Sequence, residues 1–316
     1  MKKTLIRVSF LFFLVLATCA GVYYYIFRKT TADTNDFVFA LHDKTVLMER
    51  TSSPRIVFVG GSNLVFGVDS REVEQKTGLP VVNMSMLAGY GLTFMINAAK
   101  PYIKQGDIIF ISFEYYLGEG EMDLLAHTVD MVPEAWPYLN DHEKFLYPWA
   151  EANLRLQHLI RDLQRTAQFN TGFVEKIYTR SGFNRNGDVV SHLDQPNPKT
   201  VGRRYKIEYA DYSKYIGIIN QFADYARSRG AKVFYLYPVY VRSEFNKYLA
   251  AIVAYDSQMR KSLKIPIVNS IDTFVYDDEY FFDTVYHTNK KGREMRTGKL
   301  IGIILDLFPD LKRGAS

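Results

Sequence analysis

The sequence feature that most constrains the fold is a short apolar run at residues 56–59, followed at once by Gly60, Gly61 and Ser62. Such β-branched and aromatic residues, bounded by turn residues, predict a buried central strand of a parallel sheet. Two glycines after the strand allow a backbone turn too tight for side chains. They place the Ser62 hydroxyl at the carboxyl end of the sheet, where open α/β sheets bind ligands. Gly-Gly-Ser-Asn is also an ordinary loop sequence, so Ser62 needs partners elsewhere in the chain to count as a nucleophile.

Strand and helix patterns alternate before residue 114 and again after residue 205. Strands that alternate with helices form parallel sheets with right-handed crossover connections. We therefore expect an α/β domain built around a central parallel sheet. The expected strands span residues 56–59, 79–84, 107–113, 232–237 and 265–268, and the expected helices span 69–77, 92–103, 209–229, 243–261 and about 290–307.

Residues 114–205 interrupt this alternation, and we interpret them as a mostly helical insertion. Helices are expected at residues 119–129 and 148–169, whereas Gly, Asn and Pro residues predict a loop at 181–200. Aromatic residues of the insertion suit either a sugar-stacking surface or, more commonly, its attachment to the main sheet. They are Trp136, Tyr138, Tyr147 and Trp149.

The excess positive charge of the chain lies in its amino-terminal segment. The formal net charge is +5, and residues 1–29 hold five basic residues and no acidic one, so the rest of the chain has no net charge. Without a basic surplus that could neutralise phosphates, a nucleic-acid partner is excluded. No glycine loop has the lysine and spacing of a P-loop, which disfavours nucleotide chemistry.

Residues 8–27 are apolar and about long enough to cross a bilayer. We interpret residues 1–29 as a cytoplasmic tail and transmembrane anchor, residues 30–53 as a linker with a short helix near 37–48, and residues 54–316 as an exported domain. A signal peptide cleaved near Ala20 and a lipoprotein start at Cys19 are the alternatives. Cys19 is the only cysteine, so the exported domain has no disulfide, thiolate metal site or thiol nucleophile.

The second half of the candidate site lies near the carboxyl end, where Asp283 and His287 share one loop. A serine hydroxyl needs a base to accept its proton, and the base works best when a carboxylate fixes its tautomer. Thr288 or Asn289 is expected to cap the helix that follows. The other histidines, which we interpret as solvated or structural, are His42, His127, His142, His158 and His192.

More than one group in the sequence is a candidate for orienting His287. Asp283 stands four residues before the histidine, and Asp277, Asp278 or a backbone carbonyl are the alternatives.

Together, Ser62 and the Asp283/His287 pair resemble the SGNH (GDSL-like) hydrolase superfamily over residues 54–113 and 206–308. The resemblance implies a flavodoxin-like three-layer sandwich for residues 54–316, with residues 114–205 as an insertion that the family does not match. It implies Ser62 as nucleophile, His287 as base and Asp283 as the orienting acid. The Gly-Gly-Ser-Asn stretch stands where the family has its Gly-Asp-Ser block. By the same resemblance, the candidate oxyanion donors are the backbone amides of Ser62 and Asn63 and that of Gly89 or Gly91.

The chain departs from the family pattern at two places. The family has an oxyanion-donating asparagine after the third strand, where this chain has Glu114, and an ionised carboxylate cannot donate. Loss of one such donor costs about a hundredfold to a thousandfold in rate. Asp283 and His287 are four residues apart, where the family's usual block has them three apart.

Together with the expected anchor, the domain organisation of the chain resembles that of membrane-tethered SGNH proteins that acylate polymers of the cell envelope. Examples are the D-alanyl-lipoteichoic acid biosynthesis protein and the alginate O-acetylation proteins. Those proteins work beside a multispanning membrane acyltransferase. The resemblance implies a single-pass protein of the cell membrane whose outer domain is a serine esterase or O-acyltransferase without cofactor or metal. Its substrate would be an ester-linked acyl group of an envelope polysaccharide or another acylated molecule. The alternative is a non-catalytic glycan-binding or assembly subunit whose SGNH site has decayed.

Overall fold

A parallel sheet of four strands forms the centre of the computed structural model, which describes residues 2–27, 34–167, 177–197, 201–202 and 206–313. The strands are β1 (Ile56–Gly60), β2 (Val81–Asn83), β3 (Ile108–Ser112) and β4 (Lys232–Tyr235), in the order β2-β1-β3-β4. Gly60 of β1 pairs with Ser112 of β3, so these two strands end side by side. The predicted α/β class and central parallel sheet are confirmed.

The predicted strand at residues 265–268 is reduced to one parallel bridge between Ile267 and Tyr235 of β4. Tyr235 N donates to Pro266 O (2.9 Å), and Val268 N donates to Tyr235 O (3.0 Å). Because proline has no N–H, it limits the hydrogen bonds that the segment can add to the ladder. The segment lies at the edge of the sheet without forming a strand.

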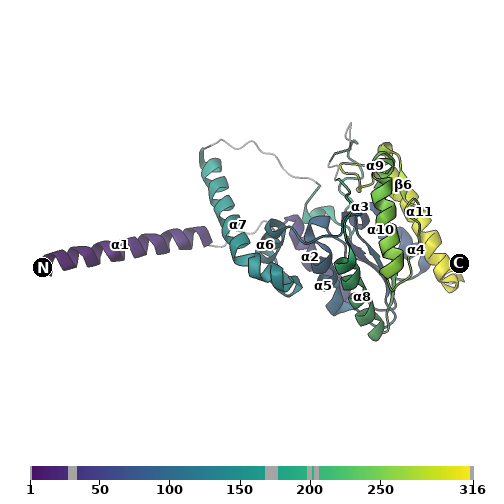
Figure 1. The fold of residues 1–316 in the computed structure, drawn as a ribbon, viewed down its shortest axis with the longest axis horizontal. Coiled ribbons are helices and arrows are strands. Elements are labelled where there is room, and N and C mark those ends of the chain that lie inside the picture. Colours follow the sequence, from purple (N-terminus) through teal and green to yellow (C-terminus); the bar gives the residue numbers. More distant parts are fainter. Residues whose placement is uncertain (1, 28–33, 168–176, 198–200, 203–205, 314–316) are drawn as a thin grey trace.

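Helices cover both faces of the sheet, which gives three layers (Figure 1). One layer contains α2 (Ala40–Arg50), α5 (Leu92–Ala99) and α8 (Ser213–Ser228). The other layer contains α3 (Ser62–Gly67), α4 (Ser70–Thr77) and α11 (Lys290–Leu307). Between β4 and α11 lie α9 (Arg242–Lys247), α10 (Leu249–Ser262), β5 (Tyr240–Val241) and β6 (Val275–Tyr276). The single helix predicted at 243–261 is therefore interrupted at Tyr248.

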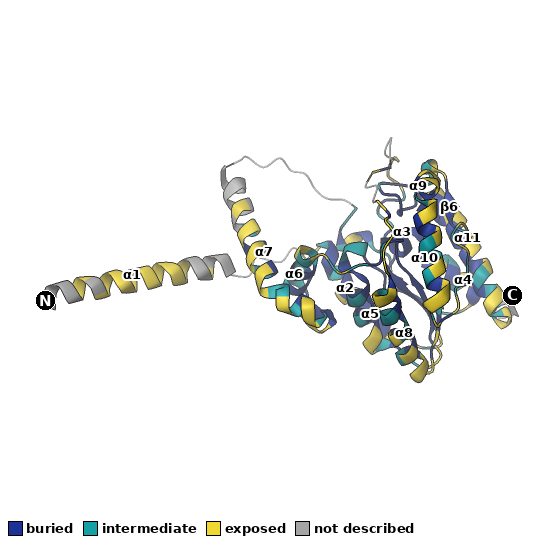
Figure 2. Cartoon of the chain, in the orientation of Figure 1, coloured by how far each residue is buried: buried dark blue, intermediate teal, exposed yellow. Residues whose placement is uncertain are grey.

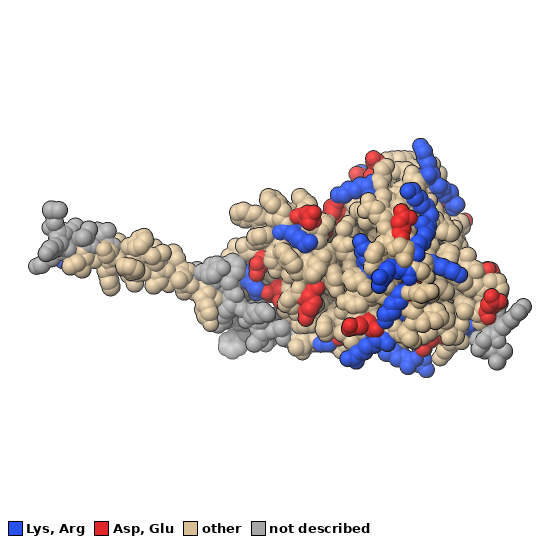
Figure 3. Space-filling model, turned by 90° about the horizontal axis from the view of Figure 1, so that it is seen from below, with Lys and Arg blue, Asp and Glu red and all other residues tan. Residues whose placement is uncertain are grey.

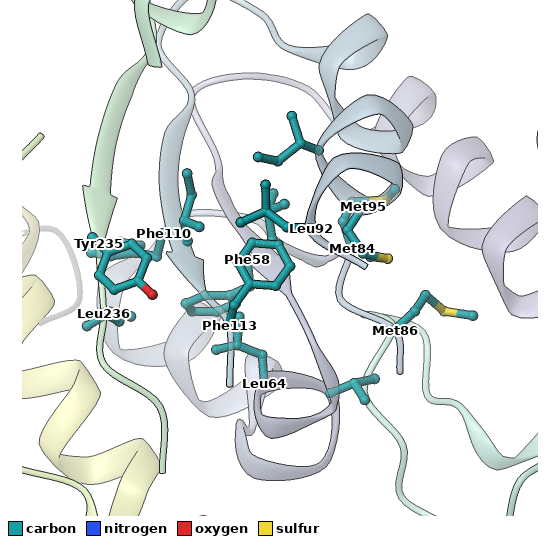
Figure 4. Packing of buried hydrophobic residues seen from close by; sticks show 14 of the residues in the cluster. Phe58, Leu64, Met84, Met86, Leu92, Met95, Phe110, Phe113, Tyr235 and Leu236 are labelled. Carbon is teal, nitrogen blue, oxygen red and sulfur yellow. The ribbon is translucent and has the colours of Figure 1, made fainter. Parts of the chain in front are cut away.

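The sheet packs through large apolar side chains on both of its faces. Phe58 of β1 and Phe110 of β3 lie with their ring centroids 6.0 Å apart, and Leu64 of α3 and Leu92 of α5 pack around them (Figure 4). All four side chains are almost completely buried. This core holds the carboxyl end of β1, and therefore the start of α3, in a fixed position.

The amino-terminal segment forms α1 (Lys2–Phe27), which extends away from the body of the protein (Figure 1). Its large apolar side chains, where described, are exposed (Figure 2). Among the residues that the structure describes, no helix has the length and hydropathy needed to cross a bilayer. Residues 30–53, interpreted as a linker, are described from residue 34 and include α2, which buries Leu41 and Met48 in the core.

The insertion contributes α6 (Met122–Met131) and α7 (Asp141–Ala167), which pack against each other. The start of α7 was predicted at Pro148, but this proline lies inside the helix. A reciprocal cap decides the true start: Glu143 N donates to Asn140 Oδ1 (2.9 Å), and Asn140 N donates to Glu143 Oε2 (2.8 Å). Such a capping box satisfies two backbone donors of the first turn.

The aromatic residues of the insertion differ in their burial and contacts. Tyr138 is buried, with its hydroxyl 3.3 Å from that of Tyr102, and so attaches the insertion to the main domain. Trp136 packs edge-on against Tyr147, with ring centroids 4.9 Å apart. Trp149 is 76% exposed and contributes to no core.

Part of the insertion belongs to the core. Asp188 is fully buried and accepts hydrogen bonds from Ser70 N (2.9 Å), Asn83 Nδ2 (2.8 Å) and Arg293 Nη2 (3.2 Å). The part of the predicted loop around Asp188 is therefore packed between β2, α4 and α11, whereas residues 194–197 are exposed.

Charged side chains of both signs lie on the face of the body seen in Figure 3, with Lys and Arg prominent among them.

Short 3₁₀ helices complete the described elements. They are η1 (Phe37–Phe39), η2 (Ala88–Tyr90), η3 (Lys100–Tyr102), η4 (Pro133–Tyr138), η5 (Arg180–Gly182), η6 (Asp278–Tyr280) and η7 (Pro309–Arg313).

Candidate active site

The turn after β1 has room for no side chain at its two glycines. A Cβ added to Gly60 would lie 1.8 Å from Ser112 O, and one added to Gly61 would lie 2.0 Å from Glu114 Oε2. The backbone of β3 therefore requires glycine at position 60, whereas at position 61 a side chain would have to displace the end of the Glu114 side chain. Ser62 follows directly as the first residue of α3, and its side chain is nearly buried.

His287 lies in the loop before α11, whose start is capped by Asn289: the Asn289 side chain accepts from Gly292 N (3.1 Å). His287 is buried, and its imidazole stacks on the ring of Phe66, with centroids 4.0 Å apart and planes 3° apart. This stacking fixes the plane of the imidazole. His287 is therefore more firmly packed than a histidine that simply opens onto a cleft.

Asp283 binds the Nδ1 edge of the imidazole, with 2.8 Å between Asp283 Oδ1 and His287 Nδ1. Burial raises the pKa of the Asp283 carboxyl, but hydrogen bonds from His287 and Tyr178 outweigh burial and hold this pKa below its ordinary value. The alternative acids are engaged elsewhere: Asp277 pairs with Arg242, and Asp278 accepts from Ser243 Oγ. Of the carboxylates considered from the sequence, Asp283 is the one on His287.

Ser62 and His287 line one cavity of about 230 Å³, although 225 positions separate them along the chain. Gly89 lines the same cavity, together with Tyr116, Tyr178 and other residues from the insertion and the loop before α11. A separate cavity of about 260 Å³ between α2 and residues 180–187 contains none of the predicted site residues.

The hydroxyl of Ser62 donates to Glu114 rather than to His287. The distance from Ser62 Oγ to Glu114 Oε1 is 3.1 Å, and the same oxygen accepts from Asn63 N (2.9 Å) and from Asn63 Nδ2 (3.4 Å). Glu114 is 1% exposed. The Glu114 carboxylate therefore already accepts a hydrogen bond from the Asn63 amide, one of the backbone amides predicted to bind an oxyanion.

Asn63 also connects this carboxylate to a buried arginine of α11. Both terminal nitrogens of Arg296 donate to Asn63, one to its backbone oxygen and the other to Oδ1 (2.8 Å). Burial lowers the pKa of Arg296 to about 10, although the charge of nearby Glu114 acts in the opposite direction. Arg296 therefore supplies a compensating positive charge for Glu114, as buried charges require.

The four predicted oxyanion donors are not equally placed. Ser62 and Gly89 line the cavity, whereas the Asn63 amide is taken by Glu114. Gly91 N donates to Ala88 O (2.9 Å), and Gly91 has φ 73° because it turns the chain into α5. The structure thus brings Ser62, Gly89 and His287 together and leaves Gly91 in a structural turn.

No family model matches the chain, and no curated protein matches it as a relative. The residues that the structure describes contain no cluster of three or more His, Cys, Asp or Glu side chains that could hold a metal ion.

Sequence reasoning missed Tyr178, which the insertion places at the site. Its hydroxyl donates to Asp283 Oδ2 and lies 3.4 Å from His287 Nδ1. A single tyrosine in a long insertion carries no sequence signal of such a role. Only the path of the chain brings it to the Asp283/His287 pair.

His192, interpreted from sequence as solvated or structural, is a buried structural residue. Its Nε2 lies 3.0 Å from Thr288 O, and its ring packs against Phe66 and Phe282. Burial lowers the pKa of His192 to about 4. It therefore supports, in its neutral form, the loop that carries His287.

Proposed function

We propose that this protein is an SGNH-type serine esterase or O-acyltransferase. The observation that carries the proposal is the convergence of Ser62, Gly89 and His287 on one cavity, with Asp283 on the far edge of the His287 ring. A nucleophile, a base and an orienting acid arranged in this way are what acyl transfer through serine requires.

The chemistry follows from the tautomer that Asp283 selects. With Nδ1–H donated to Asp283, Nε2 of His287 is unprotonated and accepts the Ser62 proton as Oγ attacks the acyl carbonyl. The backbone amides of Ser62 and Gly89 are the candidate donors to the oxyanion. The alcohol leaves with the proton from His287, and a sugar hydroxyl or water then takes the acyl group from Ser62. Attack first requires the Ser62 hydroxyl to turn from Glu114 towards His287.

The substrate we propose is a short acyl ester of a cell-envelope polysaccharide. A cavity of about 230 Å³ lies below the usual size of drug-sized pockets, which favours a small acyl group. The same proposal places the domain outside the cytoplasmic membrane, anchored by residues 1–29 and working with a multispanning acyltransferase. These parts of the proposal rest on the sequence and on the resemblance to envelope acylation proteins.

The test is covalent labelling of the full chain in detergent with a fluorophosphonate probe. We expect one adduct per chain, at Ser62 by peptide mass spectrometry, and no adduct in Ser62→Ala. A matched control is Ser228→Ala, at the far end of α8, which should label like the parent. Absence of labelling at every pH from 5 to 9 would reject the enzyme proposal.

One observation favours the second candidate, a non-catalytic glycan-binding or assembly subunit. The Glu114 carboxylate lies on the Ser62 hydroxyl and the Asn63 amide, where a developing oxyanion would need positive potential. A chain that fails to label, yet binds acylated or unacylated envelope polysaccharide in a pull-down, would support this candidate.

A further inference from the structure

We propose that Tyr178 is a positioning residue of the Asp283/His287 pair, an inference that rests on the proposed serine chemistry. Tyr178 holds the second oxygen of the Asp283 carboxylate, so that the first stays on His287 Nδ1. The insertion thereby completes the site that the α/β framework begins.

The contacts of Tyr178 are directed at both members of the pair. Its hydroxyl donates to Asp283 Oδ2, while Asp283 Oδ1 faces His287 Nδ1 at 2.8 Å. The same hydroxyl is 3.4 Å from His287 Nδ1. The three groups form a closed triangle in which the carboxylate cannot rotate without losing a hydrogen bond.

Asp283 needs such a support because little else restrains its side chain. The side chain is 29% exposed, whereas that of His287 is 6% exposed. Its backbone is held, since Gly202 N donates to Asp283 O (3.0 Å), but its carboxylate stands at the rim of the site. Asp283 and His287 are also one residue further apart than the acid and base of the usual SGNH block, which lengthens the loop between them. Without Tyr178, water competes for Oδ2 and the carboxylate gains freedom to leave His287.

The position of Tyr178 is fixed by the residues beside it. Thr179 forms an antiparallel bridge with Asp36, and Arg180 N donates to Asn35 O (2.8 Å). The Tyr178 ring also packs against Phe66, with centroids 5.7 Å apart, and Phe66 is the ring on which His287 stacks. The segment just before η1 therefore holds the tyrosine in place, and the tyrosine holds the acid. This arrangement is what pre-organised sites require, since a small misplacement of a catalytic group costs about a hundredfold in rate.

The experiment is Tyr178→Phe in the full chain, which removes the hydroxyl and keeps the ring packing. We expect kcat for a simple acetyl ester to fall about tenfold to a hundredfold with little change in KM. Tyr209→Phe is the matched control, because Tyr209 is 70% exposed and lies outside the cavity lining, and it should keep the parent's kcat.

A second measurement does not depend on activity. The ¹⁵N shifts of the His287 ring report its tautomer, and we expect Nδ1–H alone in the parent but a mixture of both tautomers in Tyr178→Phe. A variant with the parent's tautomer and the parent's kcat would overturn the role of Tyr178. If the parent has no esterase activity but the tautomer still changes in the variant, the positioning role holds and the proposed function fails.

Discussion

The carboxylate of Glu114 lies 3.1 Å from the hydroxyl of Ser62, and both groups are almost completely buried. Gly61 permits this contact, because any side chain there would collide with the Glu114 carboxylate. Glycine at position 61 and glutamate at position 114 therefore depend on each other, and the effect of Glu114 on Ser62 can be measured.

Glu114→Gln should increase turnover of an acetyl ester, by about tenfold or more. The substitution removes a negative charge beside the developing oxyanion and adds an amide that can donate to it, and one such donor contributes about a hundredfold to a thousandfold. Steady-state kinetics on the purified variant check this expectation, with exposed Glu134→Gln as the control. A loss of activity of similar size would show that the carboxylate itself helps to activate Ser62.

Asp283→Asn should reduce kcat by about ten-thousandfold, because an amide in place of the carboxylate favours the wrong imidazole tautomer. The contact of 2.8 Å between Asp283 and His287 is the basis for expecting the large effect. His287→Ala should be at least as damaging. If the loss in Asp283→Asn is below about tenfold, equivalent to roughly 1.4 kcal/mol in the barrier, another group orients His287.

Protonation of His192 should destabilise the protein in mild acid. Its pKa is lowered to about 4 in the folded chain and returns to about 6.5 on unfolding, so the unfolded state binds more protons between these values. The contribution of neutral His192 to the free energy of unfolding is fully present above pH 6.5. It is lost as the pH falls from 6.5 to 4, at up to about 1.4 kcal/mol per pH unit.

The check is urea unfolding of the parent and of His192→Asn at several pH values from 7 to 4. The variant should show a shallower loss of free energy of unfolding as the pH falls, because asparagine has no proton to gain. His142→Asn, at an exposed position, is the control and should keep the slope of the parent. Equal slopes in the parent and His192→Asn would contradict the expectation.

Lys44→Met should destabilise the protein by about 2–4 kcal/mol, because Lys44 Nζ donates to the backbone oxygens of Asn83, Ser85 and Gly187. Methionine removes the cost of burying an ammonium group, but it leaves three buried carbonyls without this donor, at about 1–3 kcal/mol each. We expect the second effect to be larger. Chemical unfolding of Lys44→Met, with the exposed Lys76→Met as the control, measures the loss of stability. An unfolding midpoint of Lys44→Met equal to that of the parent would contradict the prediction.

Most of the framework could be predicted from local sequence. Apolar runs bounded by turn residues located the four strands of the central sheet, but not the two-residue strands β5 and β6. Asn289 was one of the two residues predicted to cap α11. The boundaries that failed depend on signals that a pattern of apolar residues does not contain. The start of α7 is set by the reciprocal hydrogen bonds of Asn140 and Glu143. The prediction began the helix at Pro148, because proline is common in the first turn of a helix, but this proline lies further inside α7.

For the site, the residue types after β1 and before α11 could be predicted from local sequence, because turns and caps are properties of neighbouring residues. What stands opposite Ser62 was decided by the sheet. Gly60 and Ser112 end their strands as a pair, so the residues two positions after these ends, Ser62 and Glu114, lie side by side. The contact of Tyr178 with Asp283 likewise joins segments 105 positions apart. Such contacts depend on strand register and chain path, which no local pattern encodes, and they decide whether Ser62 faces a base or an acid.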